Sequence, residues 1–106
     1  MSIETDREVR VVINLREPED LPGSVMKAYN QIGWTNGDTP GMLGCELIRD
    51  IDEPRNFILL TRWKSLEAFR EWQFGPDHVD NPSQLRPYQD RTRGRHWAVY
   101  EISDAR

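Results

Sequence analysis

The chain has 106 residues, the size of one domain, and its 14 Lys and Arg against 18 Asp and Glu give a net charge of −4, which argues against general nucleic-acid binding. No apolar run approaches the roughly 18–20 residues of a membrane span, and the polar first residues lack the apolar core of a signal peptide. One cysteine excludes an internal disulfide and two histidines disfavour a closed zinc site, so we expect a cytoplasmic domain without metal, nucleic-acid or membrane partners.

The charged segment 1–8 has no hydrophobic periodicity and predicts a flexible arm ahead of a single domain, residues 9–106. A first strand is expected over Val9–Leu15, where apolar residues alternate. Val12 and Asn14 share one face of this strand. A side-chain amide is unfavourable in an otherwise apolar strand unless it has a hydrogen-bond partner or a function. Asn14 is therefore a candidate functional residue.

A helix is expected to run from about Glu19 to Ile32, because apolar residues recur there at helical spacing and Gly33 suits a C-cap. Two further strands follow, Met42–Arg49 and Asn56–Trp63. The second of them is apolar on both faces, which is typical of a central strand covered on both sides.

Ser65 is a suitable N-cap for a second helix, which carries Leu66, Phe69 and Trp72 and ends at Gly75-Pro76. The residues expected at the start and end of a helix and the helical spacing of the apolar residues between them therefore predict the same helix.

A long polar connection, Asp77–Gly94, contains one short helix near Pro82–Gln89 and leads to a last strand, His96–Ile102. Connections this long inside small domains often act as lids or binding loops. The order strand, helix, strand, strand, helix, strand predicts an α+β, ferredoxin-like fold. This fold has a four-stranded antiparallel sheet with two helices on one face.

The other face of such a sheet carries no helix. We assign to it Val12 and Asn14 of the first strand and one face of the third strand. The third-strand residues assigned to it are Phe57, Leu59, Thr61 and Trp63. So apolar a face needs a partner, which predicts a homodimer whose bare faces enclose cavities.

RNA-binding domains share this topology, and they stack bases on aromatic residues of their first and third strands. Val9–Leu15 contains no aromatic residue, and Asn56–Trp63 lacks the expected basic, glycine and aromatic pattern. RNA binding is therefore disfavoured.

The segment from Asn56 to Trp72, NFILLTRWKSLEAFREW, resembles the core signature of the antibiotic biosynthesis monooxygenase family. In that family the third strand ends in a Trp and a Ser-capped helix follows. Pro40-Gly41-Met42-Leu43-Gly44 resembles the family's lead into the second strand. The resemblance extends over about Val9 to Ile102 and implies a dimeric α/β barrel. Members include quinone-forming enzymes of aromatic polyketide pathways, haem-degrading enzymes and small proteins without known activity.

The polyketide enzymes use molecular oxygen without metal, flavin or haem. The resemblance therefore implies a cofactor-independent monooxygenase that oxidises a polycyclic aromatic of anthrone or naphthacenone type to a quinone in antibiotic biosynthesis. Asn14 and Trp63 occupy the positions of two cavity-lining residues of that branch. Asn14 would stabilise the enolate and Trp63 would position the ring. Leu59 stands where some members have a second Asn, which departs from the pattern.

Six further residues are expected to bind the substrate: Val12, Phe57, Leu59, Thr61, Trp72 and His78. The basic stretch of the long connection also has the chemistry to hold an anionic or phenolate substrate. It comprises Arg86, Arg91, Arg93 and Arg95. A solvated loop is the commoner role for such a stretch, as a solvated surface position is for His78 and His96.

Two alternatives to this activity remain open. In the haem-degrading branch Asn14 and Trp72 fit the pattern, but His78 follows Trp72 by only six residues and lies beyond the expected helix end. A proximal His needs a helix to hold its axial geometry. A non-oxygenase cyclase or a ligand-binding dimer is the second alternative.

Overall fold

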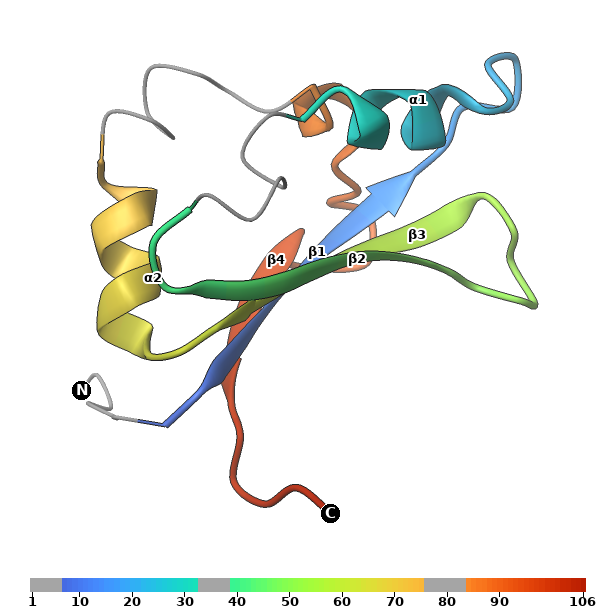
Figure 1. The fold of residues 1–106 in the computed structure, drawn as a ribbon. Helices are drawn as coiled ribbons and strands as arrows, with labels where there is room; N and C mark the ends of the chain where they lie inside the picture. Colours follow the sequence, from blue (N-terminus) through green and yellow to red (C-terminus); the bar gives the residue numbers. More distant parts are fainter. Residues whose placement is uncertain (1–6, 33–38, 76–83) are drawn as a thin grey trace.

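The computed structural model describes residues 7–32, 39–75 and 84–106 (Figure 1). One antiparallel sheet has the order β2-β3-β1-β4. Its strands are β1 Val9–Arg16, β2 Met42–Arg49, β3 Asn56–Trp63 and β4 Trp97–Glu101. The ferredoxin-like fold and the central place of β3 are confirmed, and each strand end lies within one residue of its predicted position.

The two helices, α1 Ser24–Asn30 and α2 Leu66–Gln73, pack on the same face of the sheet but near opposite ends of its strands. Val25 and Ala28 of α1 belong to a cluster with Leu15 and Phe57. The residues of the second cluster come from α2 and from the other ends of β1 and β3: Val9, Val11, Trp63, Ala68 and Phe69. Figure 1 shows α1 and α2 well separated along the sheet.

The register decides which residues share a face, because directly opposite residues of an antiparallel pair point the same way. Val11 lies opposite Thr61 and Ile13 opposite Leu59, so these residues share the face on which the helices pack. Asn14 lies opposite Ile58 and therefore points to the other face. We call these the helix face and the open face.

The prediction that the odd-numbered residues of β3 lie on the face without helices is wrong. Period-two alternation tells which residues lie together, but it does not tell which side the helices take when both sides are apolar. The open face instead carries, from the four strands, Arg10, Val12, Asn14, Gly44, Glu46, Ile48, Ile58, Leu60, Arg62, Ala98 and Tyr100. Of the six residues assigned to it, Val12 and Asn14 alone are there, so Asn14 and Trp63 lie on opposite faces.

The first helix begins later than predicted, at Ser24 rather than near Glu19. Gly23, at its N-cap, has φ of 85°, a left-handed conformation that a helix cannot include. The backbone N–H of Val25 donates to Oε1 of buried Glu17 at 3.1 Å, which satisfies a free N–H of the first turn. The expected C-cap, Gly33, lies outside the described residues.

The predicted start of α2 is confirmed, and it is joined to the start of β2. Ser65 Oγ accepts a hydrogen bond from the N–H of Ala68 at 3.1 Å. Gly41 has φ of 82°, and a Cβ on it would lie 2.6 Å from Cβ of Ala68. Gly41 also accepts a hydrogen bond from the N–H of Lys64 at 2.9 Å. Glycine is therefore required where β2 passes the first turn of α2.

The remaining predictions concern the two polar segments. A short helix, η2 Arg86–Tyr88, lies within the long connection as expected. Residues 1–6 of the predicted arm lie outside the described part of the chain. Arg7 is described, and its guanidinium donates to the carbonyl oxygen of Ser103 at 2.8 Å. Each helix within the described ranges is too short or too polar to cross a membrane.

Candidate functional site

A pocket of about 320 Å³ lies on the helix face, between the two core clusters. This volume is near the lower end of the range for small-molecule sites, about 300–1,000 Å³. Its floor consists of Val11, Ile13, Leu15, Leu59 and Thr61 from the two central strands. Its described walls come from α2 and from the segment before and at the start of β4: Phe69, Trp72, Gln73, Leu85, Arg86, Gln89, Arg91, His96 and Trp97.

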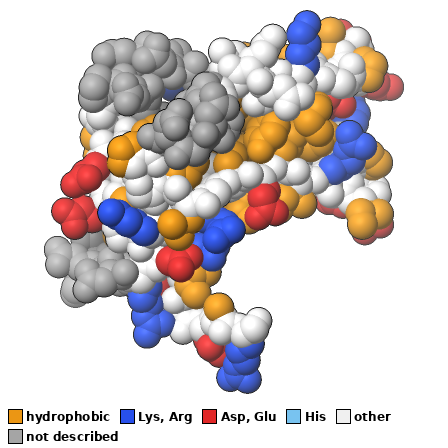
Figure 2. All heavy atoms as spheres, in the orientation of Figure 1, with side chains coloured by type: hydrophobic (Ala, Val, Ile, Leu, Met, Phe, Trp, Pro, Cys, Tyr) orange, Lys and Arg blue, Asp and Glu red, His pale blue; other side chains and the backbone are white. Residues whose placement is uncertain are grey.

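Aromatic rings form the α2 side of the pocket. The ring centroid of Phe69 lies 6.3 Å from that of Trp72 and 6.4 Å from that of Trp97. Hydrophobic side chains also gather between α1 and the sheet, as Figure 2 shows, where Tyr29 and Leu47 pack partly buried against the α1 cluster. An apolar floor beside aromatic walls suits a flat ring system.

Trp63 lies behind this pocket rather than in its lining. It is 0% exposed, and its ring centroid is 5.2 Å from that of Trp72. Its indole Nε1 donates to Thr61 Oγ1 at 2.9 Å. Direct stacking of Trp63 on a ligand is therefore not what the structure shows. Because the Thr61 oxygen accepts this bond, its own O–H can turn toward the pocket as a donor.

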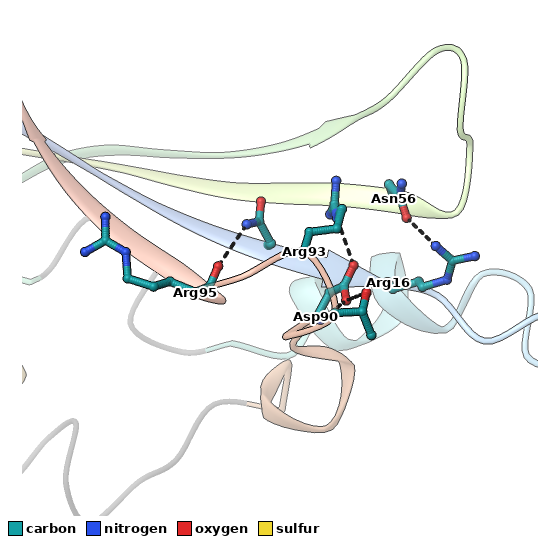
Figure 3. A network of polar contacts seen from close by, with 7 residues as sticks. Arg16, Asn56, Asp90, Arg93 and Arg95 are labelled. Atoms are coloured by element: carbon teal, nitrogen blue, oxygen red, sulfur yellow. Dashed lines mark hydrogen bonds and ion pairs between the residues drawn. The ribbon is translucent and has the colours of Figure 1, made fainter.

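Asn14 also lies outside the pocket, on the open face, where it holds the segment that precedes β4. Its side-chain Nδ2 donates to the carbonyl oxygen of Arg95 at 3.3 Å, a contact that Figure 3 draws. Its backbone N–H donates to the carbonyl oxygen of His96 at 2.7 Å, and its carbonyl oxygen accepts from the N–H of Asp90 at 2.8 Å. The expected contact between the Asn14 amide and a substrate enolate has no support in this geometry.

The segment between Asp90 and His96 is a tight polar turn (Figure 3). Asp90 is 4% exposed and accepts hydrogen bonds from the N–H and hydroxyl of Thr92 and from Nε of Arg93, the last at 3.0 Å. These contacts, the Thr92 hydroxyl first, lower the pKa of Asp90 below its ordinary value. The carboxylate therefore stays ionised and fixes the shape of the turn.

Arg91 and His96 lie beside each other at the pocket. Nε of Arg91 donates to Nδ1 of His96 at 3.4 Å. Burial, and then the charge of Arg91, lower the pKa of His96 below its ordinary value, so the ring is neutral at pH 7. Since Nδ1 accepts, the ring proton is on Nε2, which makes His96 a hydrogen-bond donor.

The predicted binding residues divide into four groups. Leu59, Thr61 and Trp72 line the pocket, although Leu59 and Thr61 were expected to line a cavity on the open face. Phe57 is on the helix face but is buried in the α1 cluster, with the Arg49 guanidinium 5.0 Å from its ring centroid. Val12 lies on the open face, away from the pocket. His78 lies outside the described residues.

Sequence reasoning missed most of the polar side of the pocket. It weighed Arg86 and Arg91 as part of a basic stretch that could hold an anionic substrate, but it favoured a solvated position for them and for His96. These residues are distant in sequence from the strands of the floor. An isolated β-bridge between Leu15 and Gln89 brings their segment back to β1, and a single pair of this kind has no periodic sequence pattern by which it could be predicted. Phe69 could have been predicted as a pocket residue, because it lies one helical turn before Trp72 on the same side of α2.

The described residues offer little to hold a metal or a haem. No three of their His, Cys, Asp and Glu side chains come together as a metal site. A haem-ligating His normally donates its second N–H to an acceptor, which makes the ligating nitrogen more basic. His96 has the opposite arrangement, because Nδ1 accepts from the Arg91 cation and Nε2 carries the proton. His96 therefore does not fit as an axial ligand.

Comparisons with known proteins agree with this fold. Protein SchA of Streptomyces halstedii is 26% identical over 94 residues, which cover 89% of this chain but 24% of SchA. The chain thus spans about a quarter of that relative's length. The structure of SnoaB, described as a cofactor-independent oxygenase from Streptomyces nogalater, superposes with a TM-score of 0.68 at 17% identity, covering 96% of this chain and 95% of SnoaB.

The structure of the heme-degrader MhuD from Mycobacterium tuberculosis superposes equally well, with a TM-score of 0.68 at 21% identity, covering 93% of this chain and 98% of MhuD. At these identities the likeness concerns the fold. The sequence profile of one family matches residues 9–80, which include the sheet strands β1 to β3 and both helices. The chain belongs to the antibiotic biosynthesis monooxygenase family.

Proposed function

We propose that this protein is a cofactor-independent monooxygenase that oxidises a flat, electron-rich polycyclic aromatic to a quinone. The observation that carries the proposal is the pocket, which combines an apolar floor and aromatic walls with polar groups on one side. Family membership and the fold shared with SnoaB support it. An anthrone-type substrate has the shape and chemistry that such a pocket accepts.

The chemistry resides largely in the substrate. Loss of a proton from the ring CH₂ gives a carbanion, delocalised as an enolate, which passes one electron to O₂. The two radicals combine to a carbon-bound peroxide, which takes up a proton and loses water to leave the quinone carbonyl. In sum, a CH₂ group and O₂ become C=O and H₂O, so no external reductant is needed.

The protein's part is to bind the ring, exclude water and favour the enolate. The hydroxyl of Thr61 is a donor on an otherwise apolar floor, where a hydrogen bond to a developing oxyanion is strongest. Trp63 fixes the Thr61 oxygen from behind, so Trp63 is a positioning residue in this proposal. Stabilising the enolate lowers the pKa of the substrate C–H, so a weaker base suffices.

Haem degradation is the second candidate, because the fold is also that of MhuD and Trp72 stands in the pocket wall. His96 does not fit as an axial ligand, as described above, while His78, the other histidine, lies outside the described residues. The third candidate is a binding or cyclase-like protein that uses the same pocket without oxygen chemistry.

We propose in addition that the protein is a homodimer joined through the open face. Apolar residues dominate the centre of that face, among them Val12, Ile58 and Leu60, while Tyr100 is 57% exposed. A face of this kind favours a partner.

Oxygen uptake with anthrone, in the presence of a metal chelator, tests the oxygenase. Uptake above the spontaneous rate, with anthraquinone formed in equal amount, would support it. Absence of uptake while anthrone still quenches tryptophan fluorescence would favour a binding protein. A Soret band on titration with haemin, followed by haem loss with a reductant, would favour the haem-degrading alternative.

A further inference from the structure

We propose that Arg91 and His96 form an anion subsite on the polar side of the pocket, and that this subsite selects aromatic ligands carrying an ionised oxygen acid such as a carboxylate. The inference rests on the proposed function only in taking the pocket as the ligand site. It adds that the substrate is an acidic aromatic rather than a neutral one.

The first argument for the anion subsite comes from the charges of the residues that line the pocket. The protein is acidic, with a net charge of −4, yet the described lining contains Arg86, Arg91 and His96 and no Asp or Glu. Arg93, next to this group in sequence, is already paired with Asp90 at 3.0 Å. Within the described residues, Arg91 has no carboxylate within ion-pair distance. The positive charge of Arg91 at the pocket is therefore available to a ligand.

The second argument comes from the geometry of Arg91 and His96. Arg91 uses Nε to contact Nδ1 of His96, which leaves its terminal N–H groups for another acceptor. His96 presents its Nε2 proton, and burial keeps the ring neutral. Two neighbouring donors, one of them charged, match the two oxygens of a carboxylate. The aromatic part of such a ligand would lie on the apolar floor, with its acid group toward Arg91.

The third argument concerns the contacts that hold the turn with Arg91 and His96 in place. The backbone of Asn14 bonds to the turn at both ends, at His96 and at Asp90, and its side-chain Nδ2 adds a hydrogen bond to the carbonyl oxygen of Arg95 at 3.3 Å. Asp90, buried and ionised, closes the turn on Thr92 and Arg93. Asn14 is therefore a positioning residue that acts on the ligand through Arg91 and His96.

Calorimetric titration with two matched probes tests the subsite without relying on oxygen chemistry. Anthraquinone-2-carboxylate and anthraquinone-2-carboxamide share ring and size and differ in charge. We expect the carboxylate to bind about tenfold tighter, the lower end of the range for hydrogen bonds to charged groups. Arg91→Gln should remove this preference. Arg95→Gln removes one charge from the same turn but not from the pocket lining, and should keep it.

Equal affinity for the two probes, or a preference that Arg91→Gln leaves intact, would overturn the subsite. Failure of both probes to bind would overturn it as well. The proposed oxygenase fails by a different result, the absence of oxygen uptake, so a protein that prefers the carboxylate but consumes no oxygen would retain the subsite and lose the oxygenase.

The role of Asn14 is tested by the ratio of the two affinities. Asn14→Ala removes the side-chain bond to Arg95 but keeps the two backbone bonds, so it should reduce the carboxylate preference about threefold while carboxamide binding is unchanged. A variant that loses affinity for both probes equally would show a merely structural role. Such a result would overturn the positioning assignment.

Discussion

The two faces of the sheet are both apolar, yet the structure uses them differently. On the helix face, Trp63 and Leu15 are 0% exposed beneath the helices. On the open face, Ile48 and Tyr100 are 43% and 57% exposed, and charged Arg10, Glu46 and Arg62 are interspersed with them. The described helices thus pack on one face, and the other is the face that we propose to form the dimer interface.

Among the described residues, the two helices cover only part of the helix face, which leaves room for the pocket. The helices have 7 and 8 residues, so each is about 11 Å long, whereas a strand of 8 residues extends about 27 Å. α1 packs over one end of the strands and α2 over the other. The middle of the floor, at Ile13 and Thr61, lies in the pocket beside the segment before β4.

The largest expected effect comes from the helix face. Trp63→Ala should cost about 3–5 kcal/mol of unfolding free energy, because it removes a fully buried indole that contacts Phe69 and Trp72. Urea denaturation measures this loss. Ile51→Ala, at a residue 91% exposed in a turn, should change stability by less than about 0.5 kcal/mol. Similar losses in the two variants would contradict the assignment of Trp63 to the core.

The open face gives the second prediction. Leu60→Lys should dissociate the proposed dimer, because it places a charge at the centre of an apolar interface. The new ammonium would lie opposite Glu46, which keeps the monomer fold stable. Sedimentation velocity should show the mass halved, whereas Ile51→Lys leaves it unchanged. An unchanged mass for Leu60→Lys would place any interface elsewhere.

This contrast between faces also marks how far the sequence alone could lead. The strands, their order, the Ser65 cap and the alternation in β3 were all predictable, because they depend on local spacing and residue type. The side on which Trp63 lies was not, since Leu59 and Leu60 are equally apolar neighbours. Deciding between them requires knowing where α1 and α2 pack, which is a property of the tertiary fold.

The site shows the same limit. Trp72 could be predicted, because a helix of clear register carries it, whereas Thr61 was singled out correctly but assigned to the wrong face of the sheet. Asn14 lies on the open face as predicted, opposite Ile58, but the pocket and Trp63 lie on the helix face, so the role taken from its family position does not follow. Arg91 and His96 reach the pocket through a turn closed by Asp90, a geometry that no periodic pattern encodes.

Within the pocket, Thr61 gives a smaller effect than the core or the interface. Thr61→Val keeps the shape but removes the hydroxyl, so turnover of anthrone should fall about tenfold with little change in binding. Thr61→Ser keeps the donor and should retain most of the activity. Stopped-flow oxygen consumption separates kcat from KM. Equal activity in the Val and Ser variants would remove Thr61 from the reaction.

The smallest effect concerns pH and distinguishes His96 from the rest of the pocket. Among the described lining residues, the charged or titratable side chains are Arg86, Arg91 and His96, and both arginines stay charged throughout. The folded-state pKa of His96 is lowered, so the stability from its neutral ring is present above about pH 6.5 and is lost as pH falls through that lowered pKa.

A bound carboxylate reverses this balance, because it favours the protonated ring. Binding then takes up a proton, and affinity for anthraquinone-2-carboxylate should rise about threefold from pH 7.5 to 5.5, a modest gain because the protonated ring lies beside the Arg91 cation and no longer accepts its hydrogen bond at Nδ1. The carboxamide should show no such rise. In His96→Gln the carboxylate affinity should be flat with pH while Arg91 keeps part of the preference. A rise that persists in His96→Gln would mean that another group takes up the proton, and the donor on the polar side of the pocket would have to be reassigned.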